Sequence, residues 1–398
     1  MRPLGLAALA AGCAVLGGAT ALAVGEAGGW LGRGAARAVV ITETRAPVAP
    51  SFPAARPLTG SGFDPAGIYA LRSPGVVTIF SVFQNGDTSQ GSGFVVSGQG
   101  YVLTSSHVVT DAGQRPQGEN PRAAEQVFVE FADRDRVSAK VVGFDLFDDV
   151  GLLRVDPAQH ALAPVPLGDS SAVRVGEPVA AIGSPFGNET SLAVGVVSAT
   201  HRAIGSLTSA YDLPGAIQVD APINHGNSGG PVFDARGRVI GIAAQIRSTS
   251  GNAEGVGFAV PIDAARRSMH ELVATGRVAY AYVGIVTEDV TPSVARRLGL
   301  SVRQGAILVS VRRGTAAAHA GLRGGTRDLE LNGRRIRAGG DVLVSIDGRP
   351  VASSEDVLRI VTEHLRPGKP ATFTVVRDGR RLNVRLVLDE RPVNPNAG

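Results

Sequence analysis

The chain has 398 residues, of which 44% are hydrophobic and 19% are charged, an ordinary composition for globular domains. Its length exceeds the size at which one hydrophobic core usually stops growing, so we expect two or three structural units. A formal net charge of +4, scattered arginines and an aromatic content of 5% argue against a nucleic-acid-binding surface, and no nucleic-acid partner is predicted.

The first 24 residues predict a signal peptide or a transmembrane anchor. Residues 3–24 form an uncharged run rich in Ala, Gly and Leu that is long enough to span a bilayer. The run ends in a small-x-small pattern at residues 21–23, which a signal peptidase could cut. Both interpretations export the rest of the chain. A lipoprotein signal at Cys13 is a weaker interpretation, because few residues precede it and the apolar run continues beyond it.

A flexible linker and then a β-rich domain are expected next. Residues 25–63 combine Gly, Ala, Pro and Arg without a sustained period, which is typical of a linker. From residue 76 to about residue 262, short β-branched runs are broken by Gly, Asn and Asp. We place the domain at residues 64–275, because residues 263–275 have helical spacing and end at a glycine, as a final helix would.

A histidine follows the first predicted β-hairpin. Residues 91–96 and 98–104 read as two strands with a turn between them, and the chain then runs directly into His107. A side chain at the end of a strand can project into a cleft, so His107 is a candidate general base. The alternative is a structural histidine that only forms hydrogen bonds.

Carboxylates precede the next apolar run. Asp149 lies immediately before residues 150–155, where an acid is buried enough to hold an imidazole in one tautomer. Asp148 beside it is ambiguous, and its simplest interpretation is a solvated loop acid.

The most specific motif surrounds Ser228, which lies in the sequence GNSGGP at residues 226–231. A serine hydroxyl is a poor nucleophile at neutral pH and needs a neighbouring base and donors for the charge on the attacked carbonyl. Glycine permits the tight turn that directs the amides of Gly226 and Ser228 into one space. The motif therefore predicts a nucleophile with an oxyanion hole, and a Gly-rich surface turn is the alternative.

Other chemistries suit the sequence less well. Cys13, the only cysteine, lies in the N-terminal apolar segment, which excludes a cysteine protease. The only lysines, Lys140 and Lys369, leave little for a Ser-Lys dyad. Seven histidines without an H-E-x-x-H helix or a Cys cluster predict neither a metal site nor a cofactor. His225 is interpreted as a loop side chain that contacts substrate, and the less favoured alternative is that it is the base.

In this order, the motifs resemble those of the HtrA (Deg) family of serine proteases. The similarity extends over residues 68–388 and includes the blocks GSGF, DVGLLRV, AIGSPFG, GVVSA, QVDA, GNSGGP and GVGFAVP. The resemblance implies a mainly β fold with a chymotrypsin-like pair of six-stranded β-barrels. It also implies that His107 is the general base, Asp149 its orienting acid and Ser228 the nucleophile of a serine endopeptidase.

The resemblance also implies how the site is completed. The oxyanion hole would consist of the amides of Gly226, Asn227 and Ser228. An amide side chain at position 227 cannot form the ion pair that activates pancreatic-type zymogens, so a movable loop is the expected switch.

The substrate pocket is expected to be small and apolar. Ile223 should line it, with Ala244, Ile246 and Val256 as neighbours, and no acid occurs at its expected floor. Such a pocket cannot pair a buried Arg or Lys, so small or medium aliphatic residues are predicted before the scissile bond. The alternative is that these residues are simply core.

Residues 279–390 resemble a PDZ domain of α+β type. Residues Tyr282, Val283, Gly284 and Ile285 match the loop whose backbone N–H groups receive a peptide C-terminus, while the peptide adds a strand to a sheet edge. The sequence departs from the usual form at an insert, residues 323–339, which alternates around an Asn-Gly pair and predicts a hairpin. The hairpin either extends a binding surface or contacts the protease domain, or it is a neutral elaboration of a loop.

The resemblance implies hydrolysis of unfolded or misfolded exported proteins, regulated by C-terminal peptides at the PDZ domain. Two alternatives stay open: a regulatory protease that cuts one specific protein, and a non-hydrolytic chaperone or PDZ adaptor. The family commonly forms trimers through aromatic residues near the start of the protease domain, for which Tyr69, Phe80 and Phe83 are candidates. We therefore predict an extracytoplasmic homotrimer, bound to the membrane if the N-terminal segment is not cleaved.

Overall fold

The computed structural model describes residues 62–115, 119–184, 190–224, 226–244, 256–331 and 333–394. All of these belong to one compact unit, residues 59–398. The predictions for the N-terminal apolar segment and almost all of the linker, and those for His225 and Ile246, lie outside the described residues. Among the described residues, no helix is both long and apolar enough to cross a membrane.

The first six strands close into an antiparallel barrel in the order β1-β2-β3-β6-β5-β4. A helix, α2 (Pro65–Arg72), and a 3₁₀ turn (Ser73–Gly75) precede it. The strands are β1 (Val76–Val82), β2 (Thr88–Val95), β3 (Tyr101–Thr104), β4 (Gln126–Glu130), β5 (Arg136–Asp145) and β6 (Val150–Val155). A short helix, α3 (Ser106–Val109), follows β3, and a 3₁₀ turn (Asp111–Gln114) follows α3. The expected hairpin before His107 is therefore confirmed as β2 and β3.

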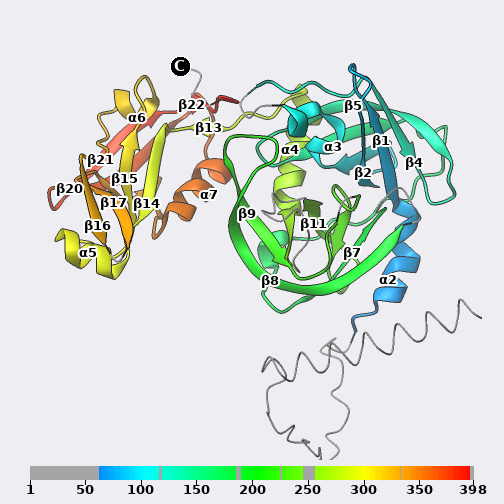
Figure 1. Cartoon of the computed structure of the whole chain (residues 1–398), viewed down its shortest axis with the longest axis horizontal. Helices are drawn as coiled ribbons and strands as arrows, with labels where there is room; N and C mark the ends of the chain where they lie inside the picture. The colour runs from blue at the N-terminus through cyan, green and yellow to red at the C-terminus, as the bar shows by residue number, and fades with distance from the viewer. Residues whose placement is uncertain are drawn as a thin grey trace, which may run out of the picture. The chain divides into compact units, whose positions relative to one another are not determined.

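A second six-stranded barrel closes in the order β10-β11-β12-β9-β8-β7. A 3₁₀ turn (Ser170–Ala172) precedes it. Its strands are β7 (Pro178–Gly183), β8 (Ser191–Gly205), β9 (Asp212–Val219), β10 (Pro231–Phe233), β11 (Val239–Ala244) and β12 (Gly257–Pro261). Together the barrels confirm the predicted mainly β, chymotrypsin-like fold (Figure 1).

One hydrophobic cluster is shared by the two barrels and holds them together. Phe94 and Leu103 of the first barrel and Phe233 and Ile242 of the second belong to it, and all four side chains are fully buried. Burial of such a side chain contributes roughly 1.5–3 kcal/mol. The strand ends and loops that carry the candidate site are thus attached to a rigid contact between the barrels.

The helix expected after the second barrel is α4 (Ile262–Thr275). Gly276 ends it in the left-handed conformation, with a φ of 75°, and its amide donates to the Leu272 carbonyl at 2.9 Å. Leu272 packs back onto the first barrel, because a Cβ added at Gly143 of β5 would lie 2.8 Å from its side chain. The helix therefore ties its own end to the strand that leads to Asp149.

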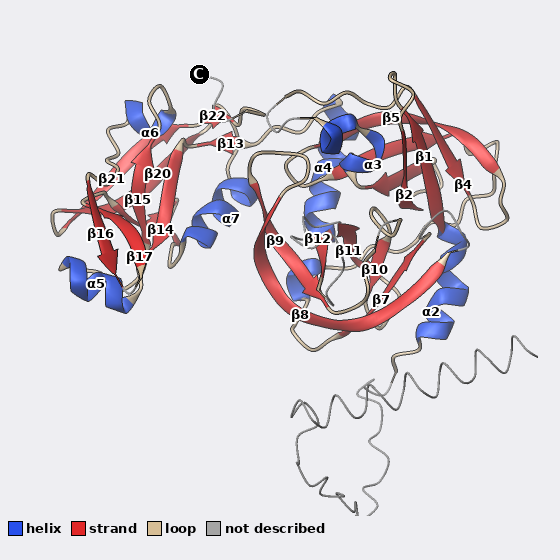
Figure 2. Ribbon diagram, viewed as in Figure 1, coloured by secondary structure: helices blue, strands red, loops and turns tan. Residues whose placement is uncertain are grey.

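The C-terminal part has a sheet with short helices, the α+β architecture expected of a PDZ domain, and is shown with the barrels in Figure 2. Its main sheet has the order β14-β15-β18-β20-β21, with β19 paired to β18, so β14 is an edge strand. Its elements are β13 (Ala281–Tyr282), β14 (Ile285–Asp289), α5 (Pro292–Leu298), β15 (Ala306–Val311), α6 (Ala316–His319), β16 (Arg327–Leu331), β17 (Arg334–Ala338), β18 (Val342–Ile346), β19 (Arg349–Pro350), α7 (Ser354–His364), β20 (Pro370–Arg377), β21 (Arg380–Val387) and β22 (Asp389–Glu390). Strands β16 and β17 pair only with each other, within the insert, and α7 contacts β9 of the second barrel.

Candidate active site

His107 and Asp149 are in direct contact at the edge of the first barrel. His107 lies in α3, immediately after β3, and Asp149 lies immediately before β6, the neighbour of β3. The distance from His107 Nδ1 to Asp149 Oδ2 is 2.8 Å. Both side chains are largely shielded from solvent, with exposed fractions of 12% and 5%. A carboxylate at this position orients the imidazole and stabilises its protonated form.

The other carboxylate oxygen of Asp149 is fixed by two donors of α3. Asp149 Oδ1 accepts the Ser106 hydroxyl at 2.7 Å and the His107 amide at 3.0 Å. The backbone of Asp149 has a φ of 51°, in the left-handed region that is costly for a residue with a side chain. The loop before β6 must therefore be held by other contacts to present the carboxylate in this way.

Ser228 lies on the loop before β10, with an exposed fraction of 3%. Its carbonyl accepts the amide of Ser92, in β2 of the first barrel, at 2.8 Å. Among the described residues, the Ser228 hydroxyl has no hydrogen-bond partner, so the structure does not join it to His107 by a hydrogen bond. Hydrogen bonds of catalytic groups are often long in unliganded enzymes and shorten when substrate binds.

Two interactions define the backbone of the nucleophile loop. The Asn227 amide donates to the Asn224 carbonyl at 3.0 Å, so it is not free to act as a third donor of an oxyanion hole. This corrects the expectation for Asn227, because that amide closes a turn inside the loop. The Ser92 hydroxyl donates to the Gly226 carbonyl at 2.5 Å and accepts the Ser184 amide at 2.8 Å. The amides of Gly226 and Ser228 stay as candidate donors.

The electrostatics of His107 suit a general base. Burial acts to lower the pKa of its imidazole, but the charge of Asp149 and the hydrogen bond to it outweigh burial and raise the pKa above the ordinary value of 6.5. The imidazole is thus neutral, and able to accept a proton, only on the alkaline side of that raised pKa.

We expect kcat/KM for peptide hydrolysis to rise with pH, with the midpoint of the acid limb above 6.5. Protonated His107 cannot accept the Ser228 proton, so activity is lost as the pH falls through the raised pKa. Initial rates across a pH series, at substrate concentrations well below KM, measure the midpoint. A midpoint at or below 6.5 contradicts the assignment of His107 as the base.

Two of the predicted substrate-pocket residues are buried in the second barrel. Ile223 and Ala244 have exposed fractions of 8% and 4%; Ile223 belongs to a hydrophobic cluster of that barrel, and Ala244 belongs to the cluster shared by both barrels. Val256 is 42% exposed, before β12. Ile223 also lies against β12, because a Cβ added at Gly257 would lie 2.5 Å from its side chain. The burial of Ile223 and Ala244 is what the alternative, that these residues are core, predicts.

The four residues of the predicted carboxylate loop connect β13 to β14. Gly284 has a φ of 78°, and an added Cβ would lie 2.4 Å from Thr315, so the position requires glycine. The carbonyls of Val283 and Gly284 accept the amides of Ala317 at 3.1 Å and Arg312 at 2.8 Å. These two hydrogen bonds fix the backbone of the loop at the start of edge strand β14.

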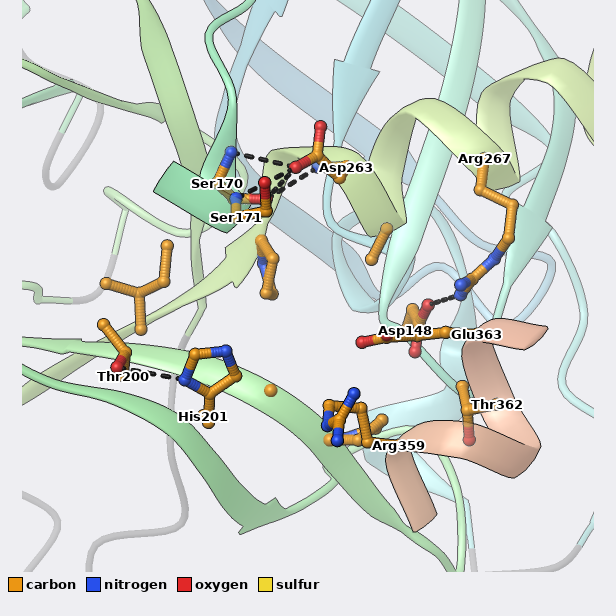
Figure 3. Close-up of a pocket in the computed structure, with 15 residues that line it drawn as sticks. Asp148, Ser170, Ser171, Thr200, His201, Asp263, Arg267, Arg359, Thr362 and Glu363 are labelled. Carbon is orange, nitrogen blue, oxygen red and sulfur yellow. Dashed lines mark hydrogen bonds and ion pairs between the residues drawn. The ribbon is translucent and has the colours of Figure 1, made fainter. Parts of the chain in front are cut away.

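Sequence reasoning misjudged Asp148. It is 1% exposed and pairs with Arg267 of α4 at 2.5 Å, so the interpretation as a solvated loop acid is wrong. Figure 3 shows this pair at the wall of a cavity of about 360 Å³, with Thr362 and Glu363 of α7 also lining it. The pair was not recognisable in the sequence because its members are 119 residues apart.

Comparisons with known proteins agree with this architecture. Residues 91–242 match the trypsin-like peptidase domain, and residues 281–388 match the PDZ domain. The chain is 37% identical over 304 residues to a probable periplasmic serine endoprotease DegP-like of Pseudomonas fluorescens, covering 76% of this chain and 57% of that protein. A DegP-like protein of Hahella chejuensis is 37% identical over 308 residues, with coverages of 77% and 58%. The chain thus spans somewhat more than half of the length of these relatives.

Solved structures extend the comparison to the whole fold. The HtrA-type protease AlgW with tripeptide superimposes with a TM-score of 0.68 at 31% identity, covering 83% of this chain and 98% of that one. The serine endoprotease from Yersinia pestis gives a TM-score of 0.58 at 26% identity, covering 82% and 98%. The chain belongs to the HtrA-type serine protease family, as its motifs predict. The curated relatives are named periplasmic, which supports an extracytoplasmic location.

Proposed function

We propose that the protein is a serine endopeptidase in which His107, Asp149 and Ser228 form the catalytic triad. The observation that carries this proposal is the contact of 2.8 Å between His107 Nδ1 and Asp149 Oδ2, on a barrel whose Ser92 also binds the loop of Ser228. The non-hydrolytic alternative gives no reason for a buried imidazole that a carboxylate orients, on a barrel that also binds the loop of a buried serine.

The proposed reaction has two steps. His107 Nε2 takes the proton of the Ser228 hydroxyl as its oxygen attacks the scissile carbonyl carbon, and the amides of Gly226 and Ser228 stabilise the resulting oxyanion. The tetrahedral intermediate collapses, and His107 returns the proton to the departing amine. A water molecule, deprotonated by His107, then attacks the acyl group, and its proton passes to Ser228 as the acid product leaves.

The proposed substrates are unfolded or misfolded exported proteins with a small or medium aliphatic residue before the scissile bond. The apolar side chains of Ile223 and Ala244 are the basis of this preference, since they offer no carboxylate to a basic side chain. A regulatory protease with one specific substrate would use the same site, so breadth of cleavage distinguishes the two.

The PDZ domain is proposed to bind peptide C-termini beside β14. An edge strand offers unpaired backbone groups to an incoming strand, and Val286 on β14 is 57% exposed. Solved structures of the relative AlgW contain a tripeptide or a decapeptide, which supports a peptide ligand for this chain.

Domain limits, membrane attachment and assembly are also proposals. We retain residues 64–275 and 279–390 as the two domains and residues 1–24 as an export signal or anchor. A homotrimer is proposed from the family alone. Phe83 is a poor candidate for its interface, because the residue is 5% exposed and packs inside the first barrel. The Tyr69 hydroxyl already has a partner within the same chain, because it donates to the Thr190 carbonyl at 2.7 Å.

Cleavage of unfolded casein by the full chain tests the proposed function, with Ser228→Ala as the matched variant. We expect cleavage by the wild-type protein and a loss of at least about a thousandfold in the variant, because the nucleophile is removed. Peptides with apolar C-termini should increase the rate. If the folded wild-type protein cleaves no faster than Ser228→Ala with and without peptides, the binding-only alternative replaces the protease.

A further inference from the structure

Two more buried carboxylates, at the end of β5 and in the loop that carries Asp149, have no role in the proposed chemistry. Asp145 and Asp148 are 2% and 1% exposed. Asp145 Oδ1 accepts the amides of Phe147 at 2.9 Å and Asp148 at 3.3 Å, so this carboxylate shapes the loop directly. Its other oxygen accepts the Ser268 hydroxyl of α4 at 2.6 Å. The backbone that leads into Asp149 is thus built around Asp145.

Tyr280, between α4 and β13, closes this cluster of carboxylates. Its hydroxyl oxygen lies 2.5 Å from Asp145 Oδ2 and 2.8 Å from Asp148 Oδ2, and its single proton satisfies one of them at a time. Arg267 donates to Asp148 Oδ2, which leaves the tyrosine proton for Asp145. Burial and the two carboxylates raise the pKa of Tyr280 well above its usual value, so the hydroxyl stays protonated and remains a donor.

Arg391, directly after β22, brings a second cation to the cluster. It is 6% exposed, and its guanidinium lies 5.1 Å from the ring centre of Tyr280 and 5.3 Å from those of Phe147 and Tyr211. Its amide donates to the Tyr280 carbonyl at 2.8 Å, and its guanidinium donates to the Thr362 hydroxyl of α7 at 3.0 Å. One side chain therefore contacts the Asp149 loop through Phe147 and the PDZ domain through α7.

The charges of the cluster balance only with both arginines in place. Burial and then the charge of Asp148 raise the pKa of Asp145 to about 6, so the Asp145 carboxylate is ionised at neutral pH. Arg267 and Arg391 supply two positive charges, the Tyr280 hydroxyl faces both carboxylates, and the Tyr211 ring lies against Arg391. Removal of one partner from a buried set of charges leaves the others unbalanced, which favours movement of the loop toward solvent.

We propose that Tyr280 and Arg391 are positioning residues for Asp149, which hold the loop before β6 in the conformation that aligns the carboxylate with His107. The inference rests on the proposed function. Asp149 has a φ of 51°, which this loop cannot maintain cheaply without outside contacts. The cavity shown in Figure 3, beside Asp148 and Arg267, gives the released loop space to move. The triad is therefore aligned only when the segments at the two ends of the PDZ domain, which carry Tyr280 and Arg391, are in place.

The test compares Tyr280→Phe and Arg391→Met with matched controls. Tyr101→Phe removes a tyrosine hydroxyl from β3, and Arg385→Met removes an exposed arginine from β21. The first readout is the titration of the His107 ring followed by NMR in the full chain. Misalignment of Asp149 weakens the attraction that raises the His107 pKa. We therefore expect the midpoint of the His107 titration to fall by about half a pH unit or more in Tyr280→Phe and Arg391→Met, and to stay unchanged in both controls.

The second readout is the hydrolysis of a peptide substrate, for which we expect kcat to fall about tenfold or more with little change in KM. A purely structural role would lower the melting temperature and leave the His107 midpoint in place. If Arg391→Met does not fold, Tyr280→Phe, which lacks one oxygen atom, carries the test.

An unchanged His107 midpoint in folded Tyr280→Phe overturns the proposal. The NMR titration does not require hydrolysis, so failure of this inference is distinguishable from failure of the proposed function, which is judged by cleavage of casein.

Discussion

Asp149→Asn is expected to lower kcat for peptide hydrolysis by about ten-thousandfold with the fold intact. The Ser106 hydroxyl and the His107 amide donate to Asp149 Oδ1, at 2.7 and 3.0 Å, so the asparagine oxygen would occupy that site. Its NH₂ group would then face His107 Nδ1 and donate to it. That interaction selects the tautomer with the proton on Nε2, which cannot accept the proton of Ser228.

The control is Asp133→Asn, which changes an Asp-His pair outside the candidate site. Asp133 Oδ2 lies 3.0 Å from His160 Nε2 and is exposed. An exposed pair contributes little, so we expect less than about a twofold change in kcat for this variant. Steady-state kinetics and circular dichroism of both variants provide the measurement. Asp149→Asn with more than about a hundredth of the wild-type kcat would show that Asp149 does not orient the base.

Gly229→Ala is expected to destabilise the protein by about 3 kcal/mol or more and to abolish hydrolysis. Gly229 has a φ of 86°, and an added Cβ would lie 2.2 Å from the Ser92 carbonyl oxygen and 2.4 Å from the Thr104 hydroxyl. Both contacts belong to the first barrel. The methyl group would therefore push the nucleophile loop away from β2 and disturb the site as well as the contact between the barrels.

Gly176→Ala separates the steric effect from the backbone effect. Gly176 has a φ of 89°, but an added Cβ meets nothing within 4 Å. We expect a loss of only about 1–2 kcal/mol for this variant, with activity preserved. Urea denaturation followed by circular dichroism gives both differences in free energy. Equal losses for the two variants would mean that the loop moves freely and that its packing on β2 is not required.

The sequence was sufficient for the features that are local in the chain. The β2–β3 hairpin, the aspartate before β6 and the glycine-rich loop each combine a short pattern of apolar residues with a diagnostic side chain, and these patterns also predict the family. The glycine that ends α4 was recognisable for the same reason. A helix commonly ends at a residue in the left-handed conformation, which glycine adopts at low cost, and residue 276 is such a position.

The cluster around Tyr280 could not be predicted in this way. Tyr280 meets Asp145 across 135 residues and Asp148 across 132, and Arg391 lies beyond the segment that matches the PDZ domain. No periodicity links such positions, and a lone arginine near the C-terminus looks like any solvated side chain. The amide of Asn227 was misplaced because its direction depends on one backbone turn, which the motif GNSGGP does not specify.

The contacts of Ser92 mean that the chemistry belongs to neither barrel. Ser92 in the first barrel binds the backbone of Ser228 and Gly226 in the second, while His107 and Asp149 remain with the first. Two fragments divided between β6 and β7 would each carry an incomplete catalyst. The activity recovered on mixing the two fragments would therefore be proportional to the number of correctly paired halves. Turnover would then measure directly how the protein assembles from its parts.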